Sequence, residues 1–201
     1  MMGLPTETME DIAGIAQLAG KVVDAYYNTP EHKKGCAVSV SVSCASFIPK
    51  PFTPFQWEGF AQREDIERKQ SYLKSRLKKL GVGFSYHDYD TSFMEALLAR
   101  GGREMSAVLL EAYRGGARFD SWDEHFDFKI YDAALKKCGT DVGAVVGKKS
   151  FDEVLPWDFV DVGVEKSYLK REAERAYAAK TTPSCLKQCN GCGLQKEGLC
   201  K

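Results

Sequence analysis

The stretch AVSVSVSCASFIPKPFTPFQW, residues 37–57, changes character halfway along its length. Over residues 37–47, valines and a cysteine alternate with serines, which is the period-two pattern of a β-strand. One face of such a strand is β-branched and suited to packing under helices, whereas the other is small and hydroxylated. Because serines fill little volume, we expect that face to border a roomy space or a polar ligand. Pro49, Pro51 and Pro54 exclude a helix and predict a stiff, extended exit from the strand.

Amphipathic helices flank this strand on both sides. Before it, Thr8 and Asp11 form a capping-box-like pair, and apolar residues then recur at helical spacing until Pro30 ends the pattern. After it, residues 63–80 form a second helix, with acidic residues in the first turn and basic residues in the last, as the helix dipole prefers. Residues 82–88 then predict another strand. The first ninety or so residues are therefore expected to alternate helix and strand.

The chain from Ser92 onward is predicted to be mostly helical. We expect helices near residues 92–99, 104–114, 121–137 and 164–179, with Trp122 and Trp157 as core anchors between them. Three regions follow from these patterns: residues 1–90 with helices and strands, residues 91–180 with helices, and a cysteine-rich tail at residues 181–201.

Composition indicates an ordinary globular chain. Of its 201 residues, 44% are apolar, and 28 basic residues balance 28 acidic ones, so no global field attracts nucleic acid or an anionic membrane. No apolar run approaches the roughly 18 residues that span a bilayer, and no secretion signal is present at the N-terminus. We therefore expect a cytoplasmic protein without a membrane partner, in a reducing compartment where clustered thiols bind metal rather than form disulfides.

The tail TTPSCLKQCNGCGLQKEGLC, residues 181–200, holds four of the seven cysteines. The first three have the spacing Cys-x3-Cys-x2-Cys, and glycines flank the third, which allows the backbone to turn back tightly. Four thiolates can hold a zinc ion or an iron–sulfur cluster, and a tail of free thiols is the remaining alternative. The candidate metal ligands are Cys185, Cys189, Cys192 and Cys200. The scattered cysteines are expected to be ordinary buried thiols: Cys36, Cys44 and Cys138.

Several segments resemble an uncharacterised family of radical S-adenosylmethionine (SAM) enzymes, whose members often carry a cobalamin-binding-type domain in front. The resemblance covers essentially the whole chain. The segments that carry it are GLPTET (3–8), IPKPFTPFQW (48–57), ARGGRE (99–104), LPWDFVDVGV (155–164) and TTPSCLKQCNGCG (181–193).

The resemblance implies an α/β fold: the last two βα units of a radical SAM partial TIM barrel, then a mostly helical region and the cysteine-rich tail. It further implies an enzyme whose 4Fe-4S cluster reductively cleaves SAM to a 5′-deoxyadenosyl radical. The cofactor contacts implied here are Gly3, Leu4, Pro5, Glu7, Ser43, Phe47 and Ile48. No residue stands out as a catalytic acid, base or radical carrier, and the substrate is not indicated.

In such enzymes the cluster loop follows the first barrel strand, so the tail cysteines are not that loop. The chain is then expected to be the C-terminal part of a longer enzyme, inactive alone, whose partner is the upstream part of the same polypeptide. The competing hypothesis is a non-catalytic binding module held together by a tail metal, with RNA as the ligand that the basic end of helix 63–80 suggests. An in-frame upstream coding region with its own Cys-x3-Cys-x2-Cys would favour the enzyme.

Overall fold

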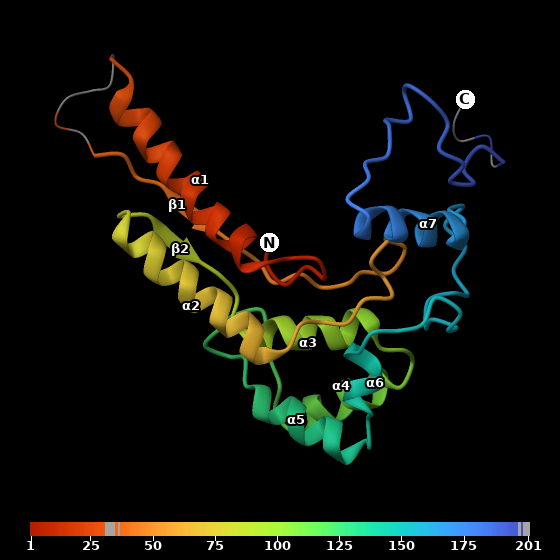
Figure 1. Cartoon of the computed structure of the whole chain (residues 1–201). Helices are drawn as coiled ribbons and strands as arrows, with labels where there is room; N and C mark the ends of the chain where they lie inside the picture. The colour runs from red at the N-terminus through yellow and green to blue at the C-terminus, as the bar shows by residue number, and fades with distance from the viewer. Residues whose placement is uncertain (31–34, 36, 197, 199–201) are drawn as a thin grey trace. The chain divides into compact units, whose positions relative to one another are not determined.

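The computed structural model describes residues 1–30, 35, 37–196 and 198, which fall into two compact units (Figure 1). Unit 1 comprises Met1–Phe47 and Ala61–Ser92, and unit 2 comprises Ile48–Phe60 and Phe93–Lys201. The chain therefore enters unit 2 once, through its proline-rich segment, before it returns to complete unit 1.

Two long helices form most of unit 1. Helix α1 (Met9–Asn28) begins at the predicted capping box: the amide of Asp11 donates to Thr8 Oγ1, and the amide of Thr8 donates to Asp11 Oδ2. Helix α2 (Arg63–Lys79) packs against α1. Both helices bury most of the apolar face that their spacing predicted, but Val22 and Leu80, which were expected on those faces, are exposed. The buried apolar residues are Ile12, Ala16 and Ala19 of α1, and Ile66, Leu73 and Leu77 of α2.

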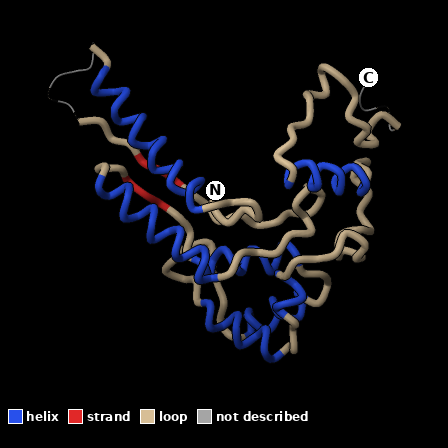
Figure 2. The backbone as a smooth tube through the Cα atoms, viewed as in Figure 1, coloured by secondary structure: helices blue, strands red, loops and turns tan. Residues whose placement is uncertain are grey.

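A small parallel sheet completes unit 1. Strand β1 (Ser41–Ser43) pairs with β2 (Gly83–Ser85) so that Val42 lies opposite Phe84 (Figure 2). The serines of β1 are exposed and Val42 is half-buried, as the alternation predicted. A separate parallel bridge joins Met2 to Ser46.

The prediction of a partial TIM barrel is wrong for this chain. Among the described residues, regular strands are confined to β1 and β2, three residues each, in one two-stranded sheet. The alternating stretch at 37–47 was expected to be strand throughout, but it pairs with a partner strand of only three residues. Because a strand exists only where a neighbouring backbone supplies hydrogen bonds, the side-chain pattern overstated the sheet. The structure is mostly helical.

The helices of unit 2 enclose an apolar core. Helix α3 (Tyr89–Arg100) crosses the boundary between the units at Phe93, and α4 (Met105–Arg114) packs against α5 (Phe128–Lys137). Helix α5 starts later than predicted because Asp127 caps it and residues 120–125 form turns. The short helix α6 (Val142–Val146) was not predicted, whereas α7 (Lys166–Tyr177) was. The core cluster is Met94, Leu97, Met105, Val108, Ala112, Tyr131, Ala134 and Leu135.

A second core of unit 2 is aromatic. Trp57 and Trp157 are buried with Leu155 and Leu169, and Trp157 Nε1 donates to Gln56 Oε1 at 2.7 Å. The predicted role of Trp157 as a core anchor is therefore confirmed. The same prediction for Trp122 is wrong, because its side chain is 56% exposed.

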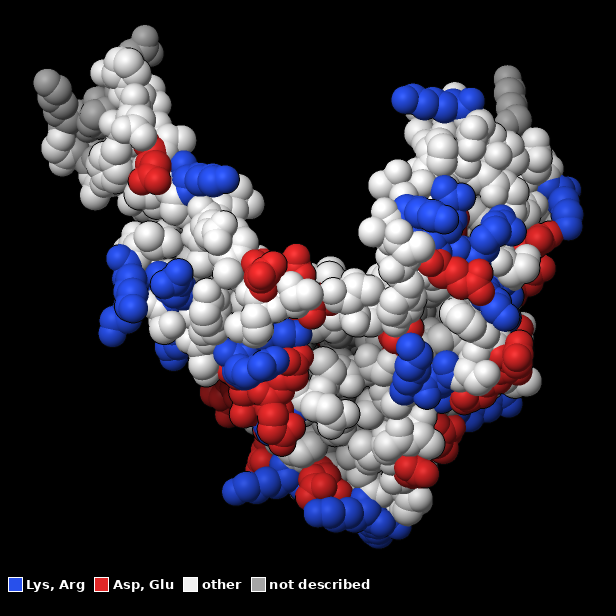
Figure 3. All heavy atoms as spheres, viewed as in Figure 1, with Lys and Arg blue, Asp and Glu red and all other residues white. Residues whose placement is uncertain are grey.

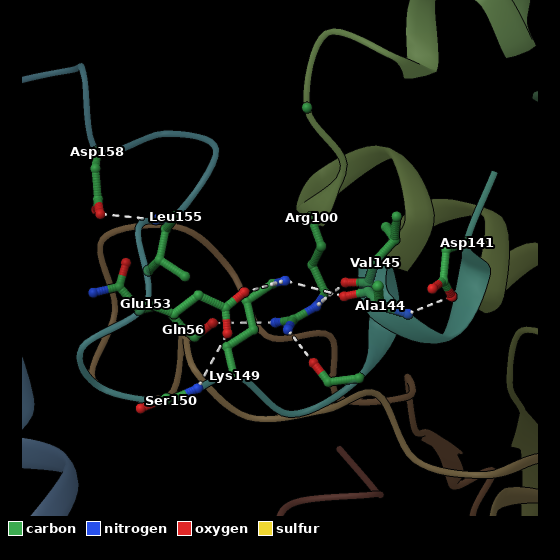
Figure 4. A network of polar contacts seen from close by, with 12 residues as sticks. Gln56, Arg100, Asp141, Ala144, Val145, Lys149, Ser150, Glu153, Leu155 and Asp158 are labelled. Atoms are coloured by element: carbon green, nitrogen blue, oxygen red, sulfur yellow. Dashed lines mark hydrogen bonds and ion pairs between the residues drawn. The ribbon is translucent and has the colours of Figure 1, made fainter.

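Arg100 at the end of α3 is completely buried and donates to three backbone carbonyls (Figure 4). Its Nε reaches Val145 O at 3.2 Å, Nη1 reaches Gln56 O at 3.1 Å and Nη2 reaches Gly147 O at 2.7 Å. Burial lowers the pKa of this guanidinium, and the nearby carboxylates of Glu153 and Glu58 partly offset the effect. The planar fork of arginine thus ties the proline-rich segment to the end of α6.

We expect Arg100→Met to destabilise unit 2 by roughly 3 kcal/mol or more, because carbonyl oxygens arranged for a cation would remain buried without donors. Arg100→Lys should recover only part of this loss, since one ammonium group cannot reach the carbonyls as a planar fork does. Urea unfolding followed by circular dichroism measures both. Arg114, exposed on α4, is the matched control, and Arg114→Met should cost under about 1 kcal/mol. Equal midpoints for the two methionine variants would contradict this role.

Candidate functional site

Two segments predicted to contact a cofactor lie side by side in unit 1. The amide of Met2 donates to Ala45 O at 2.9 Å, and the amide of Phe47 donates to Met2 O at 2.6 Å. This brings Gly3–Glu7 next to Ser43–Phe47, and we call these two stretches the paired segments. The structure therefore places Gly3 beside Phe47, since a Cβ on Gly3 would lie 3.9 Å from the Phe47 amide nitrogen. Leu4, Pro5 and Glu7 follow Gly3 in its turn, and Ser43 lies on the neighbouring strand β1. Ile48, the remaining predicted contact, is buried in unit 2.

Gly3 is required by the local geometry. Its φ of +89° lies in the left-handed region, and a Cβ at this position would meet Ile66 Cδ1 at 2.8 Å. The Gly3 amide donates to Glu7 Oε2 at 2.8 Å, and the Glu7 amide donates to Leu4 O at 3.1 Å. The Gly-Leu-Pro-Thr-Glu stretch is thus a closed turn, with Pro5 exposed at its tip.

A buried ion network holds this turn against α2. Lys69 Nζ lies 2.9 Å from Glu7 Oε2 and 2.6 Å from Asp65 Oδ2, and the side chains of Lys69 and Glu7 are 6% and 5% exposed. Burial acts to lower the pKa of Lys69, but the hydrogen bonds that it donates to Asp65 and Glu7 outweigh this effect, so the pKa is raised. Burial likewise acts to raise the pKa of Asp65, but Lys69 and Arg68 outweigh it, and that pKa is lowered. Glu7 therefore fixes the turn rather than offering a free carboxylate.

Ser46, within the second of the paired segments, carries a buried polar group without a partner. Its residue is 8% exposed, and its Oγ is buried with no hydrogen-bond partner among the described residues. A buried hydroxyl without a partner costs about 1–3 kcal/mol, and native structures normally pair such groups. The serines of β1 lie close in sequence and are exposed, so their hydroxyls, unlike that of Ser46, are open to a polar ligand.

The tail cysteines do not converge in the part of the chain that the structure describes. The thiol of Cys189 lies 3.3 Å from Gln195 Oε1, and that of Cys185 lies 3.7 Å from Asn190 Nδ2. Cys192 is engaged through its backbone carbonyl, which accepts from the amide of Glu165. No group of three or more His, Cys, Asp or Glu side chains in the described ranges is arranged for a metal ion. Cys200, the fourth predicted ligand, and Cys36 lie outside the described residues.

The sequence predicted the burial of two further cysteines but did not identify two buried polar residues. Cys44 is buried as predicted, and Cys138 is half-buried. Lys69 and Ser46 were missed. The spacing of Asp65 and Lys69, four residues apart on a helix, signals an ion pair but not its burial or its link to Glu7. No sequence signal marks Ser46 as unpaired, because burial depends on Met2 crossing beside it.

Comparisons with known proteins give one informative similarity. Over 109 residues the chain is 34% identical to the uncharacterized protein MJ0966 of Methanocaldococcus jannaschii. The aligned part is 54% of this chain and 22% of that protein, so the chain spans about a fifth of the relative's length. No family model and no solved structure matches. Within the described residues, no helix is long and apolar enough to cross a membrane.

Removal of Lys69 should destabilise unit 1. We expect Lys69→Met to lower the free energy of unfolding by about 3 kcal/mol, because it leaves Glu7 buried without its cation. Adding Glu7→Gln to this variant should restore about half of the lost free energy. Ionised Asp65 contributes fully to the free energy of unfolding above its ordinary pKa of 3.8. This contribution is lost as the pH falls through the lower pKa that Asp65 has in the folded protein. Protonated Lys69 contributes fully to the free energy of unfolding below its ordinary pKa of 10.5. This contribution is lost as the pH rises through the higher pKa that Lys69 has in the folded protein.

Chemical denaturation of the wild type and Lys69→Met across pH tests this prediction. The difference in free energy of unfolding should be constant near neutral pH and shrink toward both extremes. Lys74→Met is the matched control, since Lys74 is exposed on the same helix. A pH-independent difference, or an equal loss in Lys74→Met, would show that the network does not stabilise the turn.

The prediction that the tail binds a metal is tested by measuring the metal content of the purified protein. We expect the purified chain to contain close to one equivalent of zinc, or iron and sulfide after anaerobic preparation, and Cys189→Ser to lose it. Elemental analysis and visible absorption distinguish the two metals, and Cys138→Ser, outside the tail, serves as the control. Less than about a tenth of an equivalent of either metal, with an unchanged melting curve for Cys189→Ser, would show that the thiols are free.

Proposed function

We propose that this chain is part of a radical SAM enzyme and that the paired segments contact SAM. One observation carries the proposal. The resemblance marks two stretches about forty residues apart, Gly3–Glu7 and Ser43–Phe47, and Met2, which directly precedes the first, donates to Ala45 O and accepts from the amide of Phe47 in the second. A chance similarity in two short motifs would not require the motifs to be neighbours.

The residues of the paired segments would act as binding and positioning groups. The exposed hydroxyl of Ser43 can donate to or accept from the polar atoms of SAM directly, and the buried hydroxyl of Ser46 can do so once a local shift of the paired segments exposes it. Gly3 admits no Cβ, and Glu7 holds the turn through Gly3 and Lys69. In an enzyme of this class, a reduced 4Fe-4S cluster supplies the electron that cleaves the bound sulfonium. In the proposal, the ligands of that cluster lie outside these 201 residues, the substrate is unassigned and the enzyme is cytoplasmic.

The alternative of an RNA-binding module receives less support. On the face drawn in Figure 3, most Lys and Arg side chains lie among Asp and Glu side chains, although several on the left lie apart from acidic ones. In the first half of α2, Arg63 pairs with Glu67 and Arg68 with Asp65. The basic end that suggested RNA consists of the exposed Arg76, Lys78 and Lys79 in the last turn. This one basic turn is small compared with the extended positive surface by which proteins bind phosphate backbones.

The proposal predicts SAM binding that depends on Ser46. Equilibrium dialysis with radiolabelled SAM should detect saturable binding to the 201-residue chain, and Ser46→Ala should weaken it by roughly tenfold through loss of one hydrogen bond. The same substitution removes an unpaired buried hydroxyl, so the melting temperature should stay the same or rise. Ser71→Ala, exposed on α2, is the control. Absence of binding, or equal binding by Ser46→Ala, would overturn the assignment of the paired segments.

A second measurement tests where the cluster is held. After anaerobic reconstitution with iron and sulfide, and with a chemical reductant, the chain should produce no 5′-deoxyadenosine above a control without protein. Product that disappears in Cys185→Ser would instead identify the tail as the cluster site.

A further inference from the structure

The connection between α4 and α5 in unit 2 exposes aromatic side chains. Residues 117–128 read ARFDSWDEHFDF and carry four carboxylates against a single arginine. Phe119 is 69% exposed and Trp122 is 56% exposed, although large aromatic side chains normally seek burial. This segment has no role in the proposed contact with SAM.

The exposed rings surround a hollow. The centroids of Phe119 and Trp122 are 6.1 Å apart with planes at 71°, and those of Phe119 and His125 are 5.9 Å apart. Together with Glu124 these residues line a hollow of about 240 Å³. The hollow therefore presents rings in different orientations and one carboxylate, and we call it the aromatic hollow.

Local hydrogen bonds hold the aromatic hollow in this form. The amide of Trp122 donates to Phe119 O at 3.0 Å, and the amide of His125 donates to Trp122 O at 2.9 Å. Asp120 accepts from the hydroxyl of Tyr131 on α5 at 2.5 Å. Burial and this carboxylate raise the pKa of Tyr131 to about 12, so the hydroxyl remains a donor at neutral pH. The segment is thus anchored to the core of unit 2.

The segment's arginine does not neutralise the hollow. The guanidinium of Arg118 lies 3.5 Å from the centroid of the Tyr113 ring and donates to the carbonyls of Tyr113 and Ala117. It is not among the residues that line the hollow. The electrostatic character of the hollow is therefore set by the negative faces of its rings and by Glu124.

We propose that the aromatic hollow binds a quaternary ammonium group. Ring faces attract a cation, and several rings around one cation are the usual arrangement for recognising methylated ammonium groups. A primary ammonium would need several hydrogen-bond acceptors to replace water, and the lining offers few. The surrounding carboxylates repel phosphate, which disfavours a nucleotide stacked on the same rings. The ligand chemistry is an alkylated cation, supplied either by a small choline-like molecule or by a trimethyllysine side chain.

A charged and neutral pair of ligands tests the proposal on the full chain. Choline and its neutral isostere 3,3-dimethylbutan-1-ol have nearly the same shape, so a difference in affinity reports the charge. Trp122 is the exposed tryptophan, whereas Trp57 and Trp157 are buried, so ligand-dependent fluorescence reports mainly the hollow. We expect choline to bind about fivefold more tightly than the alcohol, because only choline carries the positive charge that exposed aromatic rings attract. Equal affinities would overturn the proposal.

Variants of the lining residues identify the place of binding. Trp122→Ala, followed by choline methyl signals in NMR, should abolish detectable binding, and Glu124→Gln should weaken it about threefold and reduce its salt dependence. Phe159→Ala, which removes another exposed aromatic of unit 2, is the control. Unchanged binding by a folded Trp122→Ala would refute the site. A trimethyllysine peptide that binds more tightly than choline supports a protein ligand, and the reverse order supports a small molecule.

Discussion

A positive charge removed from water must be surrounded by oxygen atoms, and each unit of this chain contains such a charge. In unit 1 the ammonium of Lys69 lies between the carboxylates of Glu7 and Asp65. In unit 2 the guanidinium of Arg100 lies among three backbone carbonyls. Each cation joins segments that are distant in sequence. The loops around it are therefore held in one conformation despite having little regular secondary structure.

The candidate SAM site depends directly on the first of these cations. Lys69 fixes Glu7, Glu7 accepts from the amide of Gly3, and Gly3 follows the residue whose backbone pairs with Ala45 and Phe47. A closed turn beside a single bridge would otherwise have little to hold it, because a lone β-bridge contributes few hydrogen bonds. The rigidity of the paired segments comes from this buried network, and the Ser46 hydroxyl is buried there without a hydrogen-bond partner among the described residues.

The aromatic hollow is organised differently. Its residues lie within a short stretch of chain, and successive turns position them without a buried ion. Phe119 adopts a left-handed φ of 58°, a conformation that costs a non-glycine residue about 1–2 kcal/mol and that aims its side chain out of the core. The exposed rings are thus held by the local backbone, whereas the paired segments are held by contacts that are remote in sequence.

The sequence by itself determined the elements whose signals are local. The capping pair Thr8 and Asp11 and the apolar spacing located α1 and α2, because a helix satisfies its own backbone hydrogen bonds. The tertiary structure alone decided the length of the strands, since β1 exists only where β2 lies beside it. It also decided that Trp122 is exposed, that Arg100 and Lys69 are buried, and that Ser46 is unpaired. The burial of these polar and aromatic side chains and the pairing of strands are set by neighbours in space, which the local spacing of residues does not specify.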